Sequence, residues 1–420
     1  MSVNEGAFVN ARPAWWVAPA NTLLTPATRS RFRDPARAFE AAERAAADRS
    51  GLPWPRDREF RSRMRFLSDA WLSAPGVTPL GRLSVQNEVE RRLETRLRLL
   101  HLFEARPEVA DQVVDRPVFI TGLPRTGTTF AHGLLAQHAR TRAPALWELL
   151  DPVPPSGREG ERVRDRRERL ASARSVIRFL NAMAPRWQSI HPMHPLEPEE
   201  CVFLLPHSMA HHVRIPVPEY RAWMEERDTT PDYEFLKAAL QAMQLDHATA
   251  AGRRPPASAA GRGAPRRWVL KSPLHLGSLD ALLRVFPDAT VVLTDRDPVR
   301  ATASWGSLVE AGMALHLDRV DPHWIGEEWL GIWTRSMARA ERVRAASAPG
   351  TFVDLPYDEL TADPVGVAER VWTGLGEEFD DLSRRRTTDY TRRDRRPSPH
   401  RYTIDRYGLT PERVLAAFGG

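Results

Sequence analysis

Short apolar runs alternate with stretches of helical spacing along the chain from residue 117 onward. The apolar runs predict buried strands at 117–120, 268–270 and 290–293, and a strand followed by a turn at 352–360. Helical spacing predicts helices after residue 129, over 276–285, where Pro287 ends the pattern, and over 411–418. Because strands that alternate with helices form parallel sheets, the predicted fold is α/β with a central parallel sheet.

The first hundred residues follow a different pattern. Helical spacing predicts helices at 35–47, 59–72 and 85–103, with no strand between them. We therefore expect a helical N-terminal region, residues 1–112, that packs on a core domain of residues 113–420 and shapes one wall of a pocket. Residues 252–267 (GRRPPASAAGRGAPRR) are rich in Pro, Gly, Ala and Arg, which predicts a mobile insertion loop.

A glycine-rich turn, Gly122-Leu-Pro-Arg-Thr-Gly-Thr-Thr129, follows the first predicted strand. A strand, such a turn and a helix start direct backbone N–H groups and the positive helix end at one point, which is typical of phosphate binding. The nucleotide-binding template has the same glycine spacing but a lysine where Thr128 stands. The alternative is an ATP-dependent small-molecule kinase or NTPase that holds magnesium on Asp295. Such an enzyme would lack the lysine whose charge binds the transferred phosphate.

The motif GLPRTGTT resembles the 5′-phosphosulfate loop of sulfotransferases that use 3′-phosphoadenosine-5′-phosphosulfate (PAPS), in the arginine-containing form of the bacterial branch and of tyrosylprotein sulfotransferases. A second segment, from Arg296 to Ser304, resembles their 3′-phosphate motif. The resemblance covers roughly residues 85–418. It implies a three-layer P-loop-like fold and in-line sulfuryl transfer from PAPS, without a metal, to a hydroxyl of a small-molecule, glycan or lipid acceptor.

The resemblance also assigns cofactor-binding residues. It places the 5′-phosphosulfate on Pro124, Arg125, Thr126, Gly127, Thr128 and Thr129, the 3′-phosphate on Arg296 and Ser304, and the adenine beside Tyr357. An arginine fork with a hydroxyl also suits a phosphate on chemical grounds. Arg395 and Arg396 belong to a basic run, 384–396, that lies where the family closes a segment over the 3′-phosphate. A solvated loop or a nucleic-acid contact remains open for that run.

Lysine usage singles out one catalytic candidate. The chain has 60 Lys and Arg residues, of which only Lys237 and Lys271 are lysines, and Lys271 falls at a predicted strand end. A compact, rotatable ammonium suits charge that moves during a reaction. In the family, a lysine here stabilises the departing phosphate, with Arg125 on the other side of the transferred group.

The general base is the least determined role. Tyrosylprotein sulfotransferases use a glutamate about twenty residues after the loop, which corresponds to Glu148 here. Cytosolic sulfotransferases place a histidine where this chain has Pro273, and His275 follows two residues later. We expect Glu148 to be the base that takes the acceptor proton, with His275 as the alternative. A plain helix-surface carboxylate remains open for Glu148.

Composition and residue spacing limit the other classes of protein that this chain could belong to. The 42% hydrophobic content and 13 tryptophans indicate a folded globule, and the single Cys201 excludes an internal disulfide. The absence of a transmembrane-length apolar run or signal pattern predicts a cytoplasmic protein without membrane insertion. Histidines between 191 and 212 lack the spacing of a metal-ligand set. Acids interleave the basic run 158–174, so no nucleic-acid partner is expected. Neither the acceptor nor the oligomeric state is determined.

Overall fold

The computed structural model describes residues 13–154, 159–250, 267–393 and 403–419. Arg395, Arg396 and all of the predicted insertion loop except Arg267 lie outside these ranges. Within them, every helix is too short or too polar to cross a bilayer.

Five parallel strands form one sheet in the order β2-β3-β1-β4-β5. Their bounds are Thr141–Arg142 for β2, Arg267–Lys271 for β3, Val118–Gly122 for β1, Thr290–Asp295 for β4 and Phe352–Pro356 for β5. In the central strand, Ile120 is in register with Lys271 of β3 and with Val292 of β4. The C-terminal ends of these strands therefore share one edge of the sheet. The predicted α/β fold with a central parallel sheet is confirmed.

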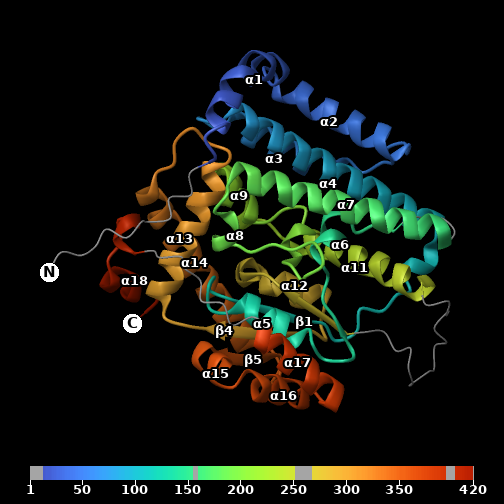
Figure 1. Cartoon of the computed structure of the whole chain (residues 1–420), viewed down its shortest axis with the longest axis vertical. Coiled ribbons are helices and arrows are strands. Elements are labelled where there is room, and N and C mark those ends of the chain that lie inside the picture. Colours follow the sequence, from blue (N-terminus) through green and yellow to red (C-terminus); the bar gives the residue numbers. More distant parts are fainter. Residues whose placement is uncertain (1–12, 155–158, 251–266, 394–402, 420) are drawn as a thin grey trace.

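Helices cover both faces of the sheet (Figure 1). Val118 and Ile120 pack with the helices α5 (Thr128–Leu135) and α16 (Pro364–Gly374). Phe119, which points to the opposite face, belongs to the large core that includes α11 (Thr230–Ala250), α12 (Leu279–Val285) and α14 (Pro322–Ala346). Alternate residues of β1 are thus buried on opposite faces, which explains its continuous apolar sequence.

Four helices precede the sheet: α1 (Val17–Arg31), α2 (Pro35–Ser50), α3 (Arg58–Ser73) and α4 (Pro79–Ala105). The last three are the predicted ones. The prediction missed α1, whose apolar residues are largely exposed and do not form one buried stripe. Helix α4 packs along α2 and also contacts α11, so the N-terminal helices lie against the helical layer of the core.

Two predicted boundaries were wrong. The helix expected over 276–285 begins only at Leu279, because Pro273–Ser278 forms a 3₁₀ helix whose start is capped by Ser272. The turn expected after β5 is the helix α15 (Tyr357–Ala362). The remaining helices are α6 (Leu146–Leu150), α7 (Glu159–Met183), α8 (Trp187–Ile190), α9 (Ala210–Arg214), α10 (Pro218–Glu226), α13 (Pro298–Ala314), α17 (Asp381–Arg393) and α18 (Pro411–Ala417). Further 3₁₀ turns are Pro107–Val109, Cys201–Phe203 and Asp405–Tyr407.

Candidate active site

The glycine-rich turn is fixed against β4. Gly122 has φ 147°, and a Cβ at this position would lie 2.3 Å from the carbonyl oxygen of Thr294. The Thr126 hydroxyl donates to the Leu123 carbonyl at 2.6 Å and lies 2.6 Å from the Thr294 hydroxyl. Gly127 has φ 88° and precedes α5, whose first N–H groups receive no side-chain cap. The turn therefore presents uncapped backbone donors at a helix start.

The two predicted anion-binding motifs meet in space. Nε of Arg125 donates to the Ser304 hydroxyl at 2.9 Å, and Nη1 of Arg296 donates to the Arg125 carbonyl at 3.1 Å. The Arg296 guanidinium also lies 3.9 Å from the centre of the Tyr357 ring. Helix α13 holds Ser304, and its first turn is capped by Asp297. Four of the predicted cofactor-binding residues are thus in one continuous contact chain.

The charge around this contact chain is positive. Within the described ranges, no carboxylate lies in ion-pair distance of Arg296. The partners of Arg125 include two neutral acceptors, the Ser304 hydroxyl and, at 3.3 Å, the Ile190 carbonyl. Two guanidinium groups beside uncapped backbone N–H groups suit an anionic ligand such as a phosphate or a sulfate. No group of three metal-binding side chains gathers in the described part of the chain.

Lys271 reaches the same site from the end of β3. Its side chain is buried, and Nζ donates to Oε1 of Glu200 at 2.8 Å and to the Thr129 hydroxyl at 3.3 Å. The Ser272 hydroxyl donates to the other oxygen of Glu200 at 3.2 Å. The lysine thus connects the helix start of the glycine-rich turn to a carboxylate that is 19% exposed.

A second carboxylate beside the lysine pairs with a histidine. Oε2 of Glu199 lies 3.2 Å from Nε2 of His191, and its Oε1 lies 4.0 Å from Nζ of Lys271. Burial alone would raise the pKa of Glu199, but the charges of His191 and Lys271 outweigh burial and bring that pKa to about 2. Burial alone would lower the pKa of His191, but the carboxylates of Glu199 and Glu200 raise it. The pair is therefore an ion pair inside the site.

Glu148 has a different environment. Its Oε1 accepts from Nη2 of Arg142 at 2.6 Å, and its Oε2 accepts from the backbone N–H of Ala145 at 2.9 Å, which caps α6. The Arg142 guanidinium stacks on Trp268, near the start of β3, at 4.3 Å from the ring centre. Lys271 is at the other end of that strand. Its Cα atom is about 10 Å from the Cα atom of Trp268, because three residues of a β-strand span that length. Among the described residues, the side-chain partners of Lys271 are Thr129, Glu199 and Glu200, so the role of Glu148 as the base stays a prediction.

His275 is enclosed by the core. Its ring is fully buried, with Nδ1 2.9 Å from the Tyr233 hydroxyl and Nε2 3.0 Å from Sγ of Cys201. Burial, assisted by the charge of Lys271, lowers the pKa of His275 to about 3, so the ring is neutral. Both ring nitrogens already have partners, which leaves none for an acceptor hydroxyl.

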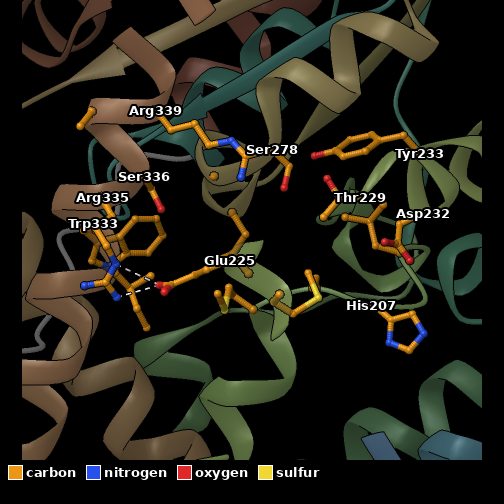
Figure 2. Close-up of a pocket in the computed structure, with 18 of the residues that line it drawn as sticks. His207, Glu225, Thr229, Asp232, Tyr233, Ser278, Trp333, Arg335, Ser336 and Arg339 are labelled. Atoms are coloured by element: carbon orange, nitrogen blue, oxygen red, sulfur yellow. Dashed lines mark hydrogen bonds and ion pairs between the residues drawn. The ribbon is translucent and has the colours of Figure 1, made fainter. Parts of the chain in front are cut away.

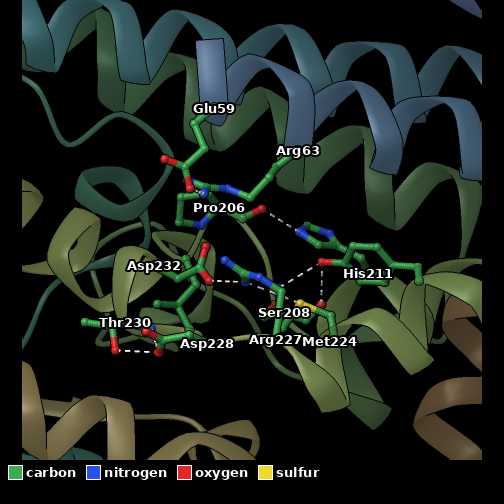
Figure 3. A network of polar contacts seen from close by, with 12 residues as sticks. Glu59, Arg63, Pro206, Ser208, His211, Met224, Arg227, Asp228, Thr230 and Asp232 are labelled. Carbon is green, nitrogen blue, oxygen red and sulfur yellow. Dashed lines mark hydrogen bonds and ion pairs between the residues drawn. The ribbon is translucent and has the colours of Figure 1, made fainter. Parts of the chain in front are cut away.

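A cavity of about 470 Å³ lies between η3 (Pro273–Ser278), α14 and the segment 205–233 (Figure 2). Tyr233 lines this cavity and also contacts His275, whereas none of the predicted site residues lines it. Figure 3 shows the polar contacts that hold the segment, among them an ion pair between Arg227 and Asp232. Burial raises the pKa of Asp232 to about 6, against the opposing charge of Arg227.

Sequence reasoning missed His191, Glu199 and Glu200 as site residues. The available signal was three carboxylates within the segment Leu196-Glu-Pro-Glu-Glu-Cys201, next to a histidine and ahead of an apolar stretch. That signal does not show which strand end the carboxylates face. The contact between Lys271 and Glu200 depends on how the long segment before α10 folds back over the sheet.

Solved structures with this architecture are sulfotransferases. The crystal structure of sulfotransferase STF1 from Mycobacterium tuberculosis matches with a TM-score of 0.72 and 28% identity, and covers 91% of this chain and 98% of that one. Sulfotransferase STF9 from Mycobacterium avium matches with a TM-score of 0.77 and 26% identity, over 90% of this chain and 94% of its own.

Sequence comparison gives the same assignment. The omega-hydroxy-beta-dihydromenaquinone-9 sulfotransferase Stf3 of Mycobacterium bovis is 26% identical over 279 residues, which are 64% of this chain and 65% of Stf3. The match thus spans just under two thirds of that relative's length. The profile of the sulfotransferase family matches residues 117–381, from the start of β1 to the start of α17. The chain therefore belongs to the sulfotransferase family.

Proposed function

We propose that this protein is an active sulfotransferase that moves a sulfuryl group from PAPS to a hydroxyl of an apolar acceptor. The observation that carries the proposal is the convergence of Arg125, Arg296, Ser304 and Lys271 at the C-terminal edge of the parallel sheet. Ligands of open α/β sheets bind at this edge. Thr128 stands where a kinase would have its phosphate-binding lysine, and nothing in the comparisons favours the kinase alternative.

The residues at this edge fit the two anionic ends of PAPS. Backbone N–H groups of residues 124–129, with the hydroxyls of Thr128 and Thr129, would hold the 5′-phosphosulfate, and Arg296 with Ser304 would hold the 3′-phosphate. PAPS would supply the activated sulfuryl group, and no metal is required of the site. Arg125 bonds to Ser304, so it would link the two anion sites as well as bind the first. The stacking of Arg296 on Tyr357 supports a place for the adenine beside that ring.

We assign proton removal from the acceptor to Glu200 in place of Glu148. Glu200 is partly exposed and contacts Lys271, whereas both oxygens of Glu148 are bound by Arg142 and by the cap of α6. Glu199 and His191 form an adjacent ion pair that would hold Glu200 in position. Lys271 would stabilise the negative charge that develops on the leaving phosphate.

The acceptor that we propose is a hydroxylated lipid or a similar apolar alcohol. The relative Stf3 is named for a hydroxylated menaquinone. The segment from Met183 to Met224 that borders the site carries the aromatic residues Trp187, Phe203, Tyr220 and Trp223. The single cysteine is buried as a free thiol, which suits the cytoplasm.

The test has a binding arm and an activity arm. 3′-Phosphoadenosine-5′-phosphate is titrated by calorimetry without magnesium against the wild type and an Arg296→Ala, Ser304→Ala double variant. We expect binding by the wild type that the double variant loses. Radiolabelled PAPS is then incubated with long-chain alcohols and hydroxylated quinones, and sulfate esters are sought by mass spectrometry. No nucleotide binding by a folded wild type, together with magnesium-dependent ATP binding, would overturn the proposal.

A further inference from the structure

Several segments of this chain contain no acidic residue, and two of them are neighbours in the fold. One runs from Gly6 to Arg33 and the other from Leu170 to Leu196. In the fold, the described parts of these segments are neighbours: the backbone N–H of Ala14 donates to the carbonyl of Met183 at 2.7 Å, and Nε1 of Trp16 donates to the carbonyl of Ala182 at 3.1 Å. The start of α1 therefore lies against the end of α7 (Figure 1).

The surface formed there combines exposed apolar side chains with arginines. Trp15 is 86% exposed, and on α7 Phe179 is 55% and Val176 47% exposed. Arg174 and Arg178 are exposed on the same helix. We call these five residues the docking face. Exposed apolar side chains that gather in one patch mark interaction sites, and aromatic residues with arginines are typical of helices that bind at a membrane surface.

The arginines of the docking face lack counter-charges. Within the described ranges, neither Arg174 nor Arg178 pairs with a carboxylate, and the only side-chain partner of Arg178 is the Ser175 hydroxyl at 3.0 Å. On the N-terminal half of the same helix, Arg164 pairs with Glu168 and Arg169 with Asp165. The two halves of α7 thus differ: the first contains acids that pair with Arg164 and Arg169, and the second, from Leu170 on, contains arginines and no acid.

The chain leads from the docking face to the candidate active site within a few residues of the end of α7. After α7, the chain passes through α8 to Ile190, whose carbonyl accepts from Arg125, and to His191, which pairs with Glu199. A bilayer against the end of α7 would therefore lie beside the segment that borders the site. We propose that the docking face binds the surface of an anionic lipid bilayer, with Trp15 and Phe179 in the interface and the arginines on the headgroups.

This peripheral contact needs no membrane-spanning helix. It would let the enzyme take a hydroxylated lipid directly from the bilayer, and that consequence rests on the proposed function, whereas the docking itself does not. The acids that border the groove beside Trp15 are Glu310 and Asp318, and Glu310 is neutralised by Arg406. Asp318 is the acid of this groove without an ion pair among the described residues, and it stands against the two arginines of the docking face.

The experiment is co-sedimentation of the full chain with phosphatidylcholine vesicles, with and without phosphatidylglycerol. We expect binding only to the anionic vesicles, and weaker binding as salt is raised. Arg174→Gln with Arg178→Gln should lower the affinity about thirtyfold, and Trp15→Ser with Phe179→Ser about tenfold. The matched controls are on α17: Arg385→Gln with Arg386→Gln, and Leu382→Ser, which remove exposed charge or apolar surface and should leave binding unchanged.

Two readouts separate the possible failures. If the wild type binds neither vesicle, or if the α17 controls lose binding as much as the docking-face variants, the proposal is overturned. If Trp15→Ser with Phe179→Ser instead converts a dimer to a monomer in gel filtration and leaves vesicle binding intact, the face is a contact between two copies of the chain. Calorimetry with 3′-phosphoadenosine-5′-phosphate on the wild type and the docking-face variants tests the proposed function separately, because the five docking-face residues are not among the proposed anion-binding residues.

Discussion

Nζ of Lys271 lies 2.8 Å from Oε1 of Glu200, although 71 positions separate the two residues in the chain. The lysine is buried and contacts Thr129 of the glycine-rich turn, whereas the glutamate is partly exposed. The proposed base and the proposed charge stabiliser are therefore neighbours in one contact, and each can be tested separately.

Glu200→Gln should lower turnover about a hundredfold or more, because the amide keeps the shape of the side chain but cannot take a proton. Nucleotide binding should change little. The matched variant is Glu148→Gln, which should instead lower the free energy of unfolding by about 3 kcal/mol, since it leaves Arg142 buried without its charge partner. Turnover and thermal unfolding are measured on both proteins. A greater loss of turnover in folded Glu148→Gln than in Glu200→Gln would return the base to Glu148.

Lys271→Ala should lower turnover about a hundredfold to a thousandfold while weakening the binding of 3′-phosphoadenosine-5′-phosphate far less. The physical reason is that the ammonium acts on charge that develops during transfer, whereas the turn, Arg296 and Ser304 supply the ground-state contacts. Steady-state kinetics and calorimetry give the two quantities. Equal losses in turnover and binding would reduce the lysine to an ordinary anion-binding residue.

The ion pair between His191 and Glu199 should make stability depend on pH in a defined window. The folded-state pKa of His191 is raised above 6.5, so its contribution is full below pH 6.5 and is lost as the pH rises through the raised value. The pKa of Glu199 is lowered from 4.5 to about 2, so its contribution is full above pH 4.5 and is lost as the pH falls toward 2.

The Tm difference between the wild type and His191→Gln should therefore be largest between pH 4.5 and 6.5 and should shrink on either side. Differential scanning calorimetry across this range measures it. His194, which forms no ion pair within the described ranges, offers the control substitution His194→Gln, whose Tm difference should be small and flat. A difference for His191→Gln that grows toward alkaline pH would contradict the ion pair.

Gly122→Ala should destabilise the protein by more than about 2 kcal/mol, because φ is 147° there and the added Cβ would meet a backbone oxygen at 2.3 Å. Gly374→Ala, at the end of α16, has no atom within 4 Å of the added Cβ and should be neutral or slightly stabilising. Thermal unfolding of the two variants gives the comparison. A stable Gly122→Ala protein would mean that the turn is held less tightly against β4 than the structure places it.

The positions of the central strands, and their burial on both faces of the sheet, follow from the sequence alone. Continuous apolar runs such as 117–120 can be buried only in a sheet covered on both faces, and the glycines of the turn after β1 specify backbone angles that other residues rarely adopt. The N-terminal helix α1 escaped prediction because exposed apolar residues and Pro26 give no helical stripe. The start of α12 was misplaced because Pro273 favours a 3₁₀ turn.

For the candidate site, the sequence by itself determined which residues are predicted as anion-binding motifs and singled out Lys271, because these predictions depend on local residue types and spacing. The tertiary structure alone decided which carboxylate meets that lysine. Glu148 is close to the turn in sequence, but its oxygens cap α6 and pair with Arg142, whose guanidinium stacks on Trp268 near the start of β3. Glu199 and Glu200 reach the lysine only because a long segment folds over the sheet edge, and contacts of that range are set by packing of the whole core rather than by local sequence.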